Sequence, residues 1–141
     1  LIYTAVGDPV NVAARLEGLS KEYGVHVVVG EATVATAPEA FVYRFLDLVA
    51  VKGRAEPLRC YEVMARAGAL APAARERLAR YQEAIDRYRS RRWEEALRLL
   101  EALDREMPGD GPIALYRRRA RALLAAPPPD DWDGVFVAET K

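Results

Sequence analysis

Cysteine and histidine are almost absent from this sequence of 141 residues, which contains one of each, Cys60 and His26. A single cysteine excludes a disulfide within the chain. One cysteine with one histidine is also too few to supply the ligands of a Cys/His zinc site. Any metal ion would therefore have to be bound through carboxylates.

The sequence also lacks long apolar runs and an excess of charge of one sign. No apolar run approaches the roughly 20 residues that cross a bilayer, and no charged and then apolar leader precedes a cleavage site. The 21 basic and 21 acidic side chains cancel, which leaves no electrostatic footprint for nucleic acid and no polybasic membrane patch. We expect a cytoplasmic protein that binds neither nucleic acid nor a membrane surface. An upstream region could still tether the full-length protein to a membrane.

What the sequence does contain is an ordinary globular composition, 51% hydrophobic and 30% charged, which predicts a folded chain. Residues 1–6 are predicted to form a strand, and the sequence starts in this strand without a methionine or a polar segment. We therefore expect a piece of a longer protein.

The periodicity of the sequence changes at residues 67–72, which are small residues ending in a proline suited to the first turn of a helix. We interpret them as a linker. Residues 1–66 alternate strand and helix signals before it, residues 73–126 are helical after it, and residues 127–141 form a tail rich in proline and acidic residues.

The first segment predicts an α+β fold. Asp8 and Pro9 have the residue types of a helix N-cap and a first helical position, and the helix should run to about Tyr23, where Gly24 supplies a left-handed stop. The other elements are inferred from β-branched runs and turn residues: strands at 2–6, 26–29, 41–51 and 58–64, and a short helix at 31–36.

The second segment predicts three helices, at about 73–90, 93–107 and 112–125. Pro108 to Gly111 separates the second from the third, and three prolines from Pro127 end the third.

Two polar side chains on the first predicted helix are candidates for chemistry. Asn11 and Arg15 are four residues apart, so they project from the same side of the helix. An amide and a guanidinium aimed together suit a phosphoryl-type transition state, in which negative charge develops on oxygen atoms. The alternative is a surface pair in which Arg15 binds a neighbouring acid such as Glu22, and the spacing alone favours this alternative.

The surrounding sequence reverses that balance. The run from Tyr3 to Glu17, with its Gly7-Asp8-Pro9-Val10-Asn11 turn, is followed at a distance by Val51-Lys52-Gly53. These motifs, in this order, resemble the class III adenylate/guanylate cyclase catalytic domain, in which a strand and an Asn-x-x-x-Arg helix precede a Val-Lys-Gly loop. The resemblance covers residues 1 to about 64 and implies the C-terminal part of a ferredoxin-like domain, a mostly antiparallel sheet with helices on it.

The resemblance implies roles for three residues. Asn11 is similar to the residue that orients the ribose 3′-hydroxyl, Arg15 to the one that stabilises the pentavalent phosphorus, and Lys52 to the lysine that grips the triphosphate. The implied reaction is attack of the 3′-oxygen of ATP on the α-phosphorus, which expels pyrophosphate and leaves 3′,5′-cyclic AMP. For Lys52 alone, a solvated turn lysine is the other interpretation.

Thr4 departs from the aspartate that the family often has at the purine-contacting position. A threonine hydroxyl can still accept a hydrogen bond and adds no charge, and a bacterial subgroup of adenylyl cyclases is similar to this chain in having threonine. We therefore favour ATP over GTP. The alternative is that Thr4 is only a β-former in its strand.

The resemblance also implies what must come from elsewhere. The family's metal-binding aspartates, which hold Mg²⁺ or Mn²⁺, lie upstream of the asparagine helix, and Asp8 is expected to cap its helix and not to replace them. The active site of the family forms between two domains arranged head to tail, and this chain matches only the domain that gives the asparagine, the arginine and the lysine. We expect the chain alone to show no cyclase activity.

The helical segment resembles one tetratricopeptide repeat, with residues 81–88 and 93–100 as its two helices, Pro108 as its end and the third helix as a cap. Such a helical hairpin with a cap could bind a protein partner. This leaves open a second hypothesis, in which a degenerate cyclase-like domain is a scaffold and the helices recruit another protein.

Two further features of the second half carry expectations. The arginine-rich run 117–121 could bind an acidic partner. Such a run is more often the solvated face of a helix, and the nearby Glu94, Glu95 and Glu101 could neutralise it. Trp132 and Phe136 in the tail are expected to dock on an apolar groove.

Overall fold

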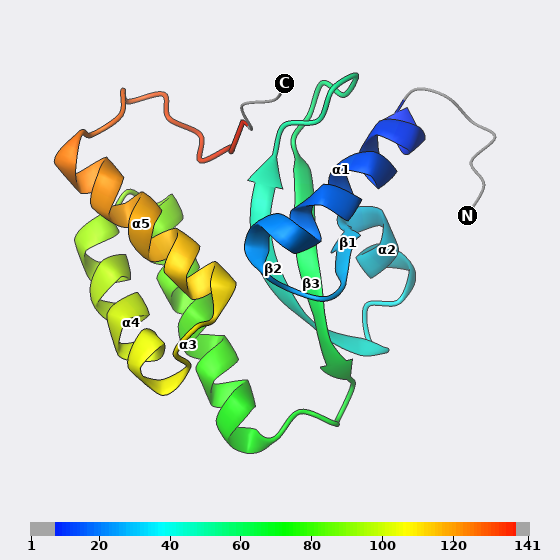
Figure 1. Ribbon diagram of the computed structural model, residues 1–141, viewed down its shortest axis with the longest axis horizontal. Helices are drawn as coiled ribbons and strands as arrows, with labels where there is room; N and C mark the ends of the chain where they lie inside the picture. The colour runs from blue at the N-terminus through cyan, green and yellow to red at the C-terminus, as the bar shows by residue number, and fades with distance from the viewer. Residues whose placement is uncertain (1–7, 138–141) are drawn as a thin grey trace. The chain divides into compact units, whose positions relative to one another are not determined.

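The computed structural model describes residues 8–137, without the side chains of residues 8–14 and 17. The predicted strand at residues 2–6, and Thr4 within it, lie outside the described residues. The described part divides into two compact units: residues up to Gly68 together with residues from Gly134, and Ala69–Asp133. Figure 1 shows a sheet with helices in the first unit and a group of helices in the second.

The first unit is built on a three-stranded antiparallel sheet (Figure 1). Its strands are β1 (Val28–Gly30), β2 (Phe41–Val49) and β3 (Leu58–Arg66), and the order β1-β3-β2 places β3 in the centre and β2 at an edge. A sheet combined with helices confirms the α+β class. The ferredoxin-like topology stays a prediction.

Helix α1 (Asp8–Tyr23) ends where the sequence predicts. Gly24 has a φ of 68°, and the Val25 N–H donates to the Ser20 carbonyl at 3.0 Å. This six-residue closure is the pattern of a Schellman C-cap, in which glycine takes the left-handed conformation at no steric cost.

Helix α1 packs on the sheet through its apolar side. Leu19 is fully buried, and so is nearly all of Tyr23. A Cβ added to Gly30 would lie 3.5 Å from Leu58 Cδ1 and 3.7 Å from Leu16 Cδ1. The leucines of α1 and β3 therefore both reach the end of β1, which leads directly into the short helix α2 (Glu31–Thr36).

The second unit consists of α3 (Pro72–Arg89), α4 (Trp93–Glu106) and α5 (Gly111–Ala125), each within about a residue of its predicted bounds. Helix α4 packs against both α3 and α5. Asp110 caps α5, because its carboxylate accepts from the Ile113 N–H at 3.1 Å. None of the helices in the described part of the chain is long and apolar enough to span a membrane.

The core of the second unit combines small and aromatic side chains. One alanine in each helix is fully buried, and the Tyr116 ring lies edge-on to two tyrosines of α3, with centroids 4.9 Å from Tyr88 and 6.4 Å from Tyr81. The alanines let the helix axes approach and the rings fill the space between them. The similarity to a tetratricopeptide repeat stays a prediction.

The chain after α5 contributes residues to both units. Trp132 belongs to the second unit, where its ring lies 5.6 Å from Tyr88 and 5.5 Å from Trp93 between centroids. Phe136 belongs to the first unit, where it forms an isolated parallel bridge with Val49.

Candidate functional site

Arg15 projects from α1 and keeps hydrogen-bond donors that no described group accepts from. Its Nη2 lies 3.5 Å from a Glu22 carboxylate oxygen, and 20% of its side chain is exposed. Its Nε and Nη2 atoms are buried and have no hydrogen-bond partner among the described residues. The ion pair with Glu22 is therefore present as the alternative interpretation expects, but it leaves N–H groups that a negatively charged ligand would satisfy.

The electrostatics of Cys60 place Arg15 close to the sheet. Cys60 pairs with Asp47 across β3 and β2. Burial raises the pKa of the Cys60 thiol to about 12, the charge of Asp47 raises it as well, and the charge of Arg15 lowers it. The guanidinium on α1 therefore acts on the same stretch of sheet as the Asp47 carboxylate.

Asp47 is a buried carboxylate that sequence analysis did not identify. It is 2% exposed, its Oδ2 accepts from the Tyr23 hydroxyl, and its Oδ1 accepts from the Leu48 N–H at 2.9 Å. The contact ties the last turn of α1 to β2. The signal that was available is an aspartate in the apolar run Phe45–Val49, where a charge needs partners.

Lys52 lies in the connection between β2 and β3. Val51, directly before it, is 6% exposed and anchors the turn, whereas Lys52 is at the surface. Gly53 has a φ of 83°, which favours glycine, and the Arg54 N–H donates to the Val51 carbonyl at 3.1 Å. The motif Val-Lys-Gly thus forms a tight turn with the lysine at its surface.

The structure describes some of the predicted site residues more fully than others. Figure 1 shows the N-terminal half of α1 and the β2–β3 connection toward the same end of the first unit. Burial raises the pKa of the Cys60 thiol, and the charges of Arg15 and of Arg54 in this connection both lower it. Asn11 is one turn before Arg15 in α1 and shares its side of the helix, but its side chain is outside what is described, as is all of Thr4.

A metal site is not formed by the described side chains. Within this part of the chain, no group of three or more His, Cys, Asp or Glu residues could hold a metal ion. The described side chains therefore do not fit the Mg²⁺ or Mn²⁺ of a cyclase.

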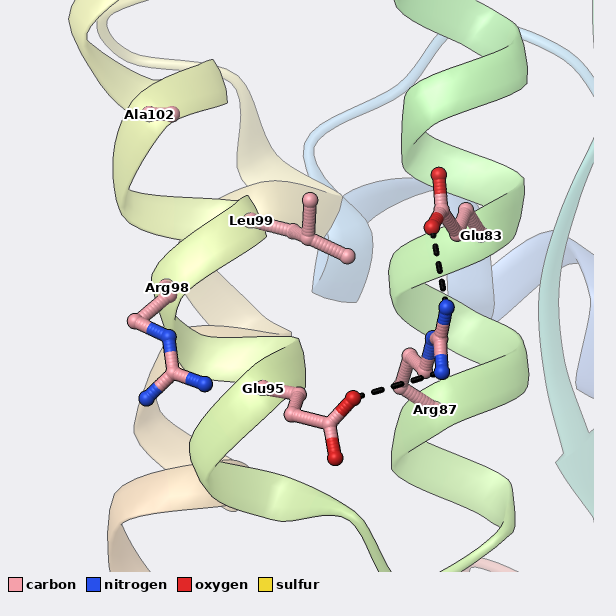
Figure 2. A pocket seen from close by; sticks show the side chains of 6 residues that line it. All are labelled: Glu83, Arg87, Glu95, Arg98, Leu99 and Ala102. Atoms are coloured by element: carbon pink, nitrogen blue, oxygen red, sulfur yellow. Dashed lines mark hydrogen bonds and ion pairs between the residues drawn. The ribbon is translucent and has the colours of Figure 1, made fainter.

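A second surface feature lies between α3 and α4 in the helical unit. It is a groove of about 270 Å³ lined by Glu83, Arg87, Glu95, Arg98, Leu99 and Ala102. Figure 2 shows Arg87 reaching Glu83 on its own helix and Glu95 on α4, both at 3.2 Å. The charges of the groove are thus largely paired with one another, and its apolar surface comes from Leu99 and Ala102.

Comparison with known proteins finds relatives with one common name. The chain is 35% identical over 120 residues to the terminal-differentiation-specific adenylate cyclase of Dictyostelium discoideum, which is 82% of this chain and 6% of that protein. It is 47% identical over 64 residues to adenylate cyclase 1 of Rhizobium meliloti (strain 1021), which is 45% of this chain and 10% of the relative. It is 46% identical over 65 residues to the adenylate cyclase of Anabaena cylindrica, which is 44% of this chain and 13% of the relative.

These matches cover small parts of long proteins, since the chain spans 6–13% of the length of these relatives. No family model and no solved structure matches the chain. The Dictyostelium match is longer than the whole first unit, so it extends into the helices of the second. The chain contains a region related to adenylate cyclases.

Proposed function

We propose that the chain is part of an adenylate cyclase, a phosphorus–oxygen lyase that converts ATP into 3′,5′-cyclic AMP and pyrophosphate in intracellular signal transduction. Its contribution is one half of a composite active site. Asn11 orients the ribose 3′-hydroxyl, and Arg15 stabilises the negative charge that develops around the α-phosphorus. Lys52 binds the triphosphate end that leaves as pyrophosphate, and Thr4 contacts the purine.

The observation that carries this proposal is the condition of the Arg15 guanidinium. Two of its nitrogen atoms are buried without a hydrogen-bond partner among the described residues, and its ion pair with Glu22 is long. Leaving such donors unsatisfied costs about 1–3 kcal/mol, more for a charged group. A phosphate oxygen would accept from them, which supports a role for Arg15 in binding a transferring phosphorus centre.

The other half of the site is proposed to come from a second cyclase domain in a head-to-tail dimer. That half holds Mg²⁺ or Mn²⁺, which neutralises charge on the triphosphate when bound. The residues of this chain then act on the opposite side of the nucleotide: they orient the attacking oxygen, stabilise the phosphorus and hold the leaving group.

Replacement of Arg15 by alanine in the full-length protein tests the proposal. We expect kcat for cyclic AMP formation to fall about 10²–10³-fold with little change in KM, because the lost interaction belongs to the transition state. Asn11→Ala should act in the same direction. Both are measured as initial rates over a range of ATP concentrations.

Lys21→Ala is the matched control, because Lys21 lies on the same helix and is exposed. It should retain the kcat of the natural protein. Glu22→Gln, which removes the ion-pair partner of Arg15 and keeps the side-chain shape, should also retain activity. A normal kcat for Arg15→Ala would refute the role assigned to it.

The second candidate function is a scaffold, in which a degenerate cyclase-like domain supports a protein-binding module of the tetratricopeptide type. The groove between α3 and α4 favours it, since alternating charges border an apolar floor there. A full-length protein that forms no cyclic AMP, and whose upstream region lacks metal-binding aspartates, would favour this function over the first.

A further inference from the structure

The segment after α5 is held on the helical unit by Arg91. The guanidinium donates to two consecutive backbone carbonyls, from Nη1 to Pro129 at 2.9 Å and from Nη2 to Pro128 at 3.0 Å. Its carbon also lies 5.0 Å from the Trp93 ring centroid and 6.0 Å from that of Trp132. One cation thus binds the backbone and two rings at once.

Trp132 completes this attachment, which we call the Arg91 clamp. Its ring lies edge-on to both Tyr88 and Trp93. Arg91 itself has a φ of 66° in the left-handed region, which costs free energy for a side-chain-bearing residue. The clamp contacts of its side chain offset that cost.

The same segment then joins the sheet of the first unit. The Phe136 N–H donates to the Leu48 carbonyl at 2.8 Å, and the Ala50 N–H donates to the Phe136 carbonyl at 3.0 Å. Val49, between these two residues, forms the parallel bridge with Phe136. Because β2 is an edge strand of the named sheet, this pairing satisfies backbone groups at its end.

The bonded residue Ala50 is two positions before Lys52. The backbone that enters the Val51-Lys52-Gly53 turn is therefore fixed on one side by β3 and on the other by Phe136. We propose that residues 134–137 are a positioning strand for the connection that carries Lys52. Its consequence for ATP rests on the proposed function, whereas its structural part does not.

Hydrogen exchange at the Ala50 amide of the 1–141 chain tests the structural part. We expect exchange to become about tenfold faster in Phe136→Pro, which removes the N–H donated to Leu48. Val137→Ala is the control, since this side chain is 68% exposed, and circular dichroism checks that the helices remain folded.

The outcomes separate the parts of the proposal. Unchanged Ala50 exchange in Phe136→Pro would overturn the positioning strand. In the full-length protein, Phe136→Pro should raise KM for ATP several-fold with kcat kept within about twofold. An unchanged KM beside faster exchange would overturn the link to Lys52. A natural protein that makes no cyclic AMP would instead overturn the proposed function and leave the exchange result standing.

Discussion

At the scale of single residues, Asp47 imposes the strictest chemical requirement on the first unit. It is almost fully buried in an apolar stretch of β2. A carboxylate in that place is tolerated only when its oxygen atoms accept hydrogen bonds. The Tyr23 hydroxyl and the Leu48 N–H supply them, and the first of these also fixes the end of the helix that carries Arg15.

Removal of the Tyr23 hydroxyl should therefore be costly. We expect Tyr23→Phe to lower the free energy of unfolding by about 1–3 kcal/mol, because it leaves a buried charged acceptor with one donor fewer. Urea denaturation followed by circular dichroism measures the change.

Tyr43→Phe is the matched control for this substitution. The Tyr43 hydroxyl donates to the neutral carbonyl of Ala37 at 2.7 Å in a half-buried position. Its removal should cost about 0.5–1.5 kcal/mol. A loss in Tyr23→Phe no larger than in Tyr43→Phe would contradict the structural importance of the Asp47 contact.

At the scale of elements, β2 and β3 are joined by a buried ion pair in addition to their backbone ladder. Arg44 lies opposite Glu62, and its Nε and Nη2 both donate to Glu62 Oε1, at 2.9 and 2.6 Å. The two side chains are only 4% and 15% exposed. Removing one partner of a buried ion pair is strongly destabilising, because the other charge stays buried and loses that partner.

Glu62→Ala should accordingly lower the free energy of unfolding by about 3–5 kcal/mol, because the buried Arg44 would lose the carboxylate to which its Nε and Nη2 donate. Glu94→Ala is the control, since the Glu94–Arg98 pair is 78% and 65% exposed and should contribute less than about 0.5 kcal/mol. Thermal and urea unfolding of the two variants distinguish them. Equal losses of stability in the two variants would show that the buried Arg44–Glu62 pair contributes no more than the exposed Glu94–Arg98 pair.

The helices were the elements that the sequence predicted best, and the reason is local. Gly24 ends α1, Pro72 begins α3, and the break at 108–111 separates α4 from α5. Each signal acts within a turn or two of its own residue. The strand predicted at 41–51 is less accurate, because β2 ends at Val49.

What could not be predicted depends on residues far apart in the sequence. The end of β2 is bonded to Phe136, and nothing in the local sequence of either segment indicates the other. The expected neutralisation of residues 117–121 was right for Glu101, which pairs with Arg121, but wrong for Glu94 and Glu95. Those two bind arginines nearer to them, and the carboxylate that pairs with Arg117 is Asp104.

The candidate site shows the same division. The spacing of Asn11 and Arg15 and the Val-Lys-Gly turn are local patterns, and they led to the resemblance. The Tyr23–Asp47 contact and the bond between Ala50 and Phe136 arise only when α1, β2 and the tail are folded together. Residues that support a site are thus harder to find from sequence than residues that act in it.

At the scale of the whole molecule, the sheet and the helices are matched together in one relative. The match to the Dictyostelium adenylate cyclase extends beyond the first unit into the helices. The tail contributes residues to both units.

A half-site predicts a specific result when chains are mixed. The 1–141 chain alone should form no cyclic AMP, because the proposed metal-holding half is a different domain. In the full-length protein, a chain with Arg15→Ala and a chain lacking the proposed upstream metal ligands should each be nearly inactive. Co-expressed, they should recover a substantial part of the activity, since one of the two sites in a mixed head-to-tail dimer then combines a natural metal half with a natural Arg15 half. Two chains that both carry Arg15→Ala are the control and should stay inactive, and failure of the mixed pair to recover, with dimers confirmed by light scattering, would refute the shared site.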